Sequence, residues 1–119
     1  MDLSGENNDL LLRLMSAASL RARVLAANVA NQNTPGYKRQ LVRFEDALLR
    51  ELERPQPQPE RVAPRVVEDE EGKPDASGNT VDMEREVSAM RENRLLYELF
   101  ANILAGRTRI VQLAVREGR

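Results

Sequence analysis

Residues 28–38 of the chain read NVANQNTPGYK, and this stretch separates two long helical patterns. Pro35 and Gly36 suit the two central positions of a type II turn, the second of which requires a positive φ. Asparagine tolerates the left-handed conformation, so Asn31 or Asn33 is expected to end the preceding helix. The stretch therefore predicts the end of one helix followed by a change in chain direction.

The helical pattern before this stretch covers residues 9–33. Its apolar side chains recur at alternating spacings of four and three residues, which is the heptad pattern of a coiled coil. The members of this seam are Leu11, Met15, Ala18, Ala22, Leu25 and Val29. An amphipathic helix in an ordinary bundle also fits the pattern, but the length of the seam favours a coiled coil.

A second long helical pattern covers residues 81–116. Its seam and the stripe beside it include Met83, Val87, Met90, Tyr97, Phe100, Ala101, Leu104, Ile110 and Val111. Between Leu95 and Ala105 this helix is apolar over most of its circumference, and such helices are normally surrounded by several others. One short partner from the same chain does not cover that surface, so we expect the chain to assemble.

Charge is ordered along the second helix. Acidic residues occupy its first turns, at Asp82, Glu84 and Glu86, whereas Arg107, Arg109 and Arg116 lie toward its end. This order complements the helix dipole. It also suits stacked copies in which an acidic end meets a basic end, although the dipole is a sufficient explanation.

Between the long patterns, apolar residues at helical spacing predict a short helix near residues 43–53. Residues 55–76 then combine five prolines with an acidic run, which favours an extended or disordered linker or arm. A short strand at residues 65–68 is the alternative there. The predicted fold is all-α: a discontinuous coiled-coil assembly domain from residues 1–54 and 77–119, with the short third helix and an extended proline-rich middle.

The composition argues against chemistry at a catalytic site. The chain has 119 residues, no cysteine, no histidine and a net charge of −1. Thiol nucleophiles, histidine bases and nearly all zinc sites are therefore excluded. No phosphate-binding loop is present, and the acidic pairs lie in exposed positions. We predict a protein that is not an enzyme, holds no cofactor or metal, binds no nucleic acid and inserts no segment into a membrane.

Residues 28–38, which we call the signature stretch, resemble a segment of bacterial flagellar rod, hook and related axial proteins. In these proteins a small apolar segment leads into two asparagines three residues apart, here Asn28 and Asn31, followed by Asn33 and Thr34. The continuation through Pro35, Gly36 and Tyr37 is typical of rod members. Residues 78–87, which read GNTVDMEREV, are similar to the C-terminal block of a proximal rod protein. Val87 stands where the family often has methionine, which is an apolar exchange.

The resemblance implies a structural subunit of the flagellar proximal rod, for torque transmission and subunit export. Its terminal helices would pair as a coiled coil and pack against copies of itself. Its other implied partners are rod proteins of the FlgC and FlgF type, the adaptor FliE, the export gate and the MS ring. The start of the sequence lacks the pattern of a secretory signal. We therefore expect export without signal cleavage and a place in the periplasmic rod of the basal body.

Two roles are open for the signature asparagines. They either cap the helix and form the turn, or they bond a neighbouring helix, and the second role suits Asn28 because it lies inside the helix. Other classes of protein also stay open at this point. One is another axial member of the family, similar to FlgC, and another is a soluble helical adaptor or export chaperone that binds a client helix. A DNA-binding bundle lacks the basic face it needs.

Overall fold

The computed structural model describes residues 5–118 and shows a long, thin molecule of 68 × 31 × 14 Å. In chain order it contains α1 (Gly5–Ala30), β1 (Gln40–Arg43), α2 (Glu45–Leu52), the 3-10 helix η1 (Pro59–Arg61), β2 (Arg65–Glu68) and α3 (Met83–Glu117). The fold is mostly helical, as predicted. The all-α description needs a correction, because β1 and β2 form a two-stranded sheet. Residues 1–4 and 119 of the expected helical domain lie outside the described residues.

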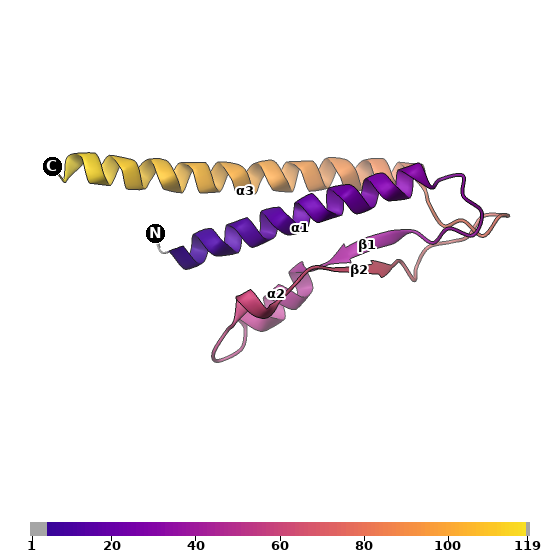
Figure 1. The fold of residues 1–119 in the computed structure, drawn as a ribbon, viewed down its shortest axis with the longest axis horizontal. Coiled ribbons are helices and arrows are strands. Elements are labelled where there is room, and N and C mark those ends of the chain that lie inside the picture. Colours follow the sequence, from indigo (N-terminus) through magenta and orange to yellow (C-terminus); the bar gives the residue numbers. More distant parts are fainter. Residues whose placement is uncertain (1–4, 119) are drawn as a thin grey trace.

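Helix α1 lies between α3 on one side and the sheet with α2 on the other (Figure 1). The two long helices run antiparallel, because α1 and α3 contact each other in opposite order along the sequence. Asn93 donates to the carbonyl oxygen of Ala18 at 2.8 Å, and Asn28, later in α1, donates to Glu86, earlier in α3, at 3.2 Å. The antiparallel arrangement is established by these contacts, whereas knobs-into-holes coiled-coil packing stays a prediction.

The main apolar core lies under α2 rather than between the long helices. Phe44 and Leu48 are buried against Ala17 of α1, and Leu10, Leu14 and Val62 pack around them. Helix α2 has a strongly amphipathic sequence, so one face supplies this core and the other is exposed. Its bounds agree with the short helix predicted near residues 43–53.

The sheet joins the proline-rich middle segment to the residues that follow the Pro35–Gly36 turn. Strand β1 pairs antiparallel with β2, and Gln40 lies opposite Glu68 while Arg43 lies opposite Arg65. The alternative of a strand at residues 65–68 is therefore confirmed. Strand β1 was not predicted, because four residues reading QLVR give too short an alternation to identify a strand. The division of the chain into a helical domain and a linker stays a prediction.

The turn after α1 has the predicted geometry. The N–H of Tyr37 donates to the carbonyl oxygen of Thr34 at 3.2 Å, and Gly36 has a φ of 73°, as the third residue of a type II turn requires. Among the described residues only Gly36 and Gly78 have positive φ, so the prediction of a left-handed Asn31 or Asn33 was wrong. The helix ends instead in a tightened turn, with the Asn31 N–H shared between the carbonyl oxygens of Ala27 and Asn28.

Candidate assembly surface

Helix α3 leaves most of its apolar side chains uncovered. Leu95 is 67% exposed, Leu99 52% and Val115 57%, which is unusual for so many large aliphatic residues on one helix. The other exposed large apolar residues on α3 are Met83, Val87, Met90, Tyr97, Ile103, Ile110, Val111 and Leu113. Exposed apolar side chains in this number on one helix indicate an interaction surface.

The predicted seam of α3 does not face α1 in its first half. Glu86 and Asn93, which are seven residues apart and so share one face, are the buried residues of α3. Met83, Val87, Met90 and Tyr97 lie on the neighbouring face and are exposed, and we call them the apolar stripe. Farther along, Phe100, Ala101 and Leu104 are half-buried, whereas Ile110 and Val111 are exposed.

The residues of the seam predicted on α1 also differ in burial. Leu11, Ala18 and Leu25 are buried, Met15 and Val29 are half-buried, and Ala22 is exposed. Helix α1 is also buried on a second side, where Ala17 contacts the core under α2. The small side chain at position 22 leaves a hollow beside α3, because no large group there fills the space between the helices.

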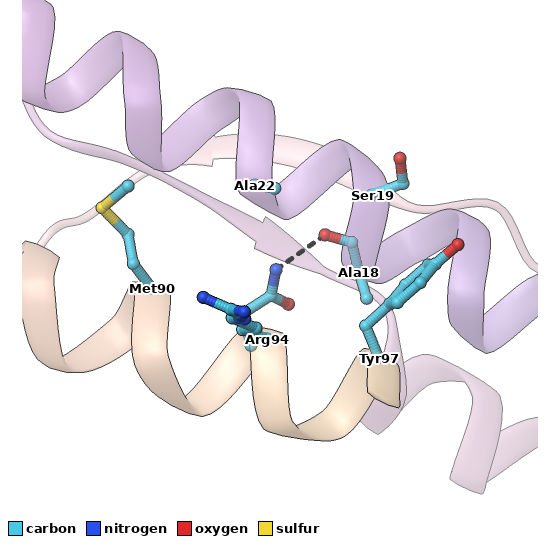
Figure 2. A pocket seen from close by; sticks show the side chains of 7 residues that line it. Ala18, Ser19, Ala22, Met90, Arg94 and Tyr97 are labelled. Atoms are coloured by element: carbon cyan, nitrogen blue, oxygen red, sulfur yellow. Dashed lines mark hydrogen bonds between the residues drawn. The ribbon is translucent and has the colours of Figure 1, made fainter. Parts of the chain in front are cut away.

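This hollow is a groove between α1 and α3 with a volume of about 370 Å³. Figure 2 shows Ser19 and Ala22 on the α1 side of the groove and Met90 and Tyr97 on the α3 side, with Arg94 between the last two. The lining residues are Ala18, Ser19, Ala22, Met90, Asn93, Arg94 and Tyr97. Because two members of the apolar stripe line it, the groove and the stripe form one continuous surface.

Asn28 is a buried hub that joins three elements of the chain. Its Nδ2 donates to the carbonyl oxygen of Gln40 at 2.7 Å and to Glu86 at 3.2 Å. Its Oδ1 accepts from the N–H of Gln40 at 3.0 Å and from the hydroxyl of Tyr37 at 3.3 Å. The predicted inter-helix role of Asn28 is therefore seen within one chain, where it connects α1 to β1 and α3.

Asn31 takes the other of the two predicted roles. Its Nδ2 bonds the carbonyl oxygen of Ala27 at 2.8 Å, and its Oδ1 accepts from the hydroxyl of Thr34 at 3.1 Å. These bonds stay within the helix end and the turn. Asn33 and Pro35 are exposed. Asn79, from the block before α3, closes the turn by donating to the carbonyl oxygens of Asn31 at 2.9 Å and Thr34 at 2.8 Å.

Beside the hub lies a buried ionic cluster that the sequence analysis missed. The Arg39 guanidinium contacts Glu86 and lies 2.9 Å from Asp69, and all three side chains are at most 7% exposed. Arg85 lies 3.4 Å from Asp69 as well. In the sequence, the only sign of this cluster was the acidic residue Glu86, one turn inside α3. The helix dipole was a sufficient explanation for an acidic residue there, so no basic partner was predicted.

The cluster determines the charge state of Asp69. Burial raises the pKa of this carboxyl, but the N–H of Glu71 and the Arg39 guanidinium both donate to it and outweigh burial. The pKa of Asp69 therefore lies below its usual value. Asp69 thus keeps its charge to lower pH than a free aspartate does, and its ion pair with Arg39 ties the end of β2 to the segment before β1.

The signature stretch has counterparts in known proteins. A family model described as "Flagella basal body rod protein" matches residues 14–38. The chain is 29% identical to the flagellar basal body rod protein FlgB of Escherichia coli (strain K12), over 92% of this chain and 96% of that protein. It is also 29% identical to FlgB of Borrelia hermsii, over 91% of this chain and 94% of that protein.

The chain is therefore similar to flagellar basal body rod proteins named FlgB over most of its length. The family match runs from the middle of α1 through the Pro35–Gly36 turn to Lys38, so it contains the Asn28 hub and the α1 wall of the groove. Residues 5–118 contain no cluster of three acidic, histidine or cysteine side chains suited to a metal ion. No helix in that range combines the length and apolar character needed to cross a bilayer.

Proposed function

We propose that this FlgB-like chain is a structural subunit of the proximal rod that polymerises through its two terminal helices. The observation that carries the proposal is the uncovered apolar surface of α3, where side chains such as Leu95 and Val115 are more than half exposed in the single chain. Burying such surface against neighbouring copies removes apolar area from water, which is the main driving force of protein association.

The shape of the molecule supports a subunit of an extended assembly. Helix α3 has 35 residues, which corresponds to about 52 Å of helix. A contact that repeats head to tail along such a molecule gives a helical filament unless the rotation closes a ring. The buried Asn28 hub and the Arg39 cluster hold the sheet against α1 and α3, so torque applied to one layer passes to the others.

Location and partners are parts of the same proposal. The subunit is exported without signal cleavage and takes its place in the periplasmic part of the basal body. It connects the export gate, the MS ring and the adaptor FliE below to rod proteins of the FlgC and FlgF type above. Similarity to proteins named as rod components supports the flagellar setting.

The proposal is tested with a strain that lacks the gene. Electron microscopy of its purified basal bodies should show membrane rings without a rod, and the cells should not swim. The wild-type gene restores both, as does Ser88→Asp, which changes an exposed polar position. Met90→Asp, two residues away on the apolar stripe, is expected not to restore the rod. Complete basal bodies in the deletion strain would contradict the proposal.

A further inference from the structure

Among residues 5–118, no other helix lies beside the far end of α3. Helix α3 extends beyond the start of α1 (Figure 1), and residues 110–117 are all exposed. We call these residues the overhang. Val111 and Val115, four residues apart on one face, are 41% and 57% exposed. A helix with an apolar face normally lies against another element. The exposure of Val111 and Val115 shows that no such element covers the overhang within the described part of the chain.

At the other end of the molecule, the apolar stripe lacks a helix in the same way. Met83, Val87 and Met90 are 36–40% exposed, and they lead from the first turn of α3 into the groove beside Ala22. The stripe from Met83 to Tyr97 is about 21 Å long, and the overhang is about 12 Å long. The overhang is therefore short enough to lie entirely within the stripe.

Direction and charge bring these two surfaces together between copies. The overhang points away from one end of the molecule, and the start of α3 lies at the opposite end (Figure 1). Two copies in the same orientation, shifted along the long axis, place the overhang of one beside the start of α3 of the next. The overhang follows Arg109 and contains Arg116 and Glu117, so its basic residue nearest the rim is Arg109, whereas Glu84 and Asp82 are exposed at the start of α3.

Two arginines near the stripe have acidic partners of their own, and Arg94, which lines the groove, lies 3.1 Å from Glu98. Arg85 lies 3.4 Å from Asp69, so its charge is directed toward the sheet rather than toward the stripe. Opposite charges at the rim of an apolar contact fix its orientation and register. The small Ser19 and Ala22 side chains on the α1 wall allow an incoming helix to approach closely.

We propose that the overhang of one copy docks on the apolar stripe of a second copy, entering from the acidic end and reaching the groove. This contact rests on the proposed function and gives its subunit interface. It joins two different surfaces, so it propagates head to tail rather than closing a two-fold dimer. The outer face of α3, with Leu95 and Leu99, stays available for other neighbours.

Introduced cysteines test the contact in purified basal bodies, because the chain has no cysteine of its own. Val115→Cys is combined in turn with Met83→Cys, Val87→Cys or Met90→Cys, three positions that sample the register along the stripe. At least one combination should give a ladder of disulfide-linked multimers after oxidation. The matched control combines Val115→Cys with Leu99→Cys, which is 52% exposed on the outer face, and should give no ladder.

Each other outcome overturns the contact. A ladder from the Leu99→Cys control alone would place the overhang on the outer face. A dimer from Val87→Cys without Val115→Cys would show a two-fold contact. If the cells swim but none of the three combinations gives a ladder, the proposed contact is wrong, whereas the proposed rod function is unaffected. Complete basal bodies without the gene would remove the rod function itself.

A charge reversal gives a second readout that does not depend on cysteine variants. Glu84→Arg and Arg109→Glu each place like charges at the proposed rim, and each should abolish or strongly reduce swimming. The two changes in one chain restore opposite charges between copies and should restore swimming. If the double variant swims no better than the single variants, the proposed contact is incorrect.

Discussion

Asn28 bonds both backbone groups of Gln40, donating to its carbonyl oxygen at 2.7 Å and accepting from its N–H at 3.0 Å. An asparagine side chain thus pairs with β1 as a neighbouring strand would. The amide has a donor and an acceptor at fixed spacing, which leucine and aspartate lack. This relationship explains why a fully buried polar residue lies at the start of the signature stretch.

We predict that Asn28→Leu lowers the free energy of unfolding by about 2–4 kcal/mol, because it leaves buried backbone groups of β1 unpaired. Urea titration followed by far-ultraviolet circular dichroism measures the change. Asn33→Leu is the control, since that side chain is exposed, and it should stay within about 0.5 kcal/mol of the wild type. Equal effects of both substitutions would show that the hub is not a stabilising element.

Arg39 pairs with two buried carboxylates, so replacing it should lower the free energy of unfolding. Arg39→Met leaves Glu86 and Asp69 without their common partner, and we expect a loss of about 3–5 kcal/mol in unfolding free energy. The control is Arg43→Met, an exposed arginine on the same strand segment, with an expected change below about 0.5 kcal/mol. A small effect at position 39 would mean that water reaches both carboxylates.

The cluster also predicts an acid dependence. The pKa of Asp69 is lower in the folded chain than in the unfolded chain, so its contribution is complete above the ordinary aspartate pKa of about 3.9. That contribution is lost as the pH falls through the lower folded-state value. When the pH is lowered from roughly 5 to 2, the window in which such carboxylates titrate, the free energy of unfolding of Asp69→Asn should therefore fall less than that of the wild type. Glu70→Gln, exposed beside it, serves as the control in the same urea series.

Phe44 anchors the core under α2 and is 2% exposed. Phe44→Ala should cost about 3–5 kcal/mol, because it removes a large ring and leaves a cavity beside Ala17 and Leu48. Leu49→Ala on the same helix changes a side chain that is 59% exposed and should cost less than about 1 kcal/mol. Similar losses at the two positions would show that α2 does not pack as described.

Replacement by alanine should change the stability of the chain in opposite directions at two glycines. Gly36 has a φ of 73°, so Gly36→Ala should destabilise the chain by about 1–2 kcal/mol although space for a Cβ is available. Gly106 lies within α3, where an added Cβ meets nothing within 4 Å, so Gly106→Ala should stabilise the helix by about 0.5–1 kcal/mol. Thermal unfolding of the two variants compares the signs directly. A stabilised chain that no longer supports swimming would place Gly106 in a contact between copies.

The sequence by itself determined the elements that depend on local interactions. The heptad spacing identified both long helices, the spacing of Phe44 and Leu48 identified α2, and Pro35–Gly36 identified the turn that the Thr34–Tyr37 hydrogen bond confirms. The signature stretch also indicated the rod family. Each of these signals is contained in neighbouring residues, so periodicity and turn chemistry suffice.

Only the tertiary structure decided which face of α3 turns toward α1. The apolar spacing favoured the face of Met83 and Val87, yet Glu86 and Asn93 face inward because partners arrive from distant segments. Strand β1 likewise depends on Asn28 and on β2, which are remote in sequence. Burying a polar side chain is favourable only when its partners are in place, and those partners are supplied by the fold rather than by the neighbouring sequence.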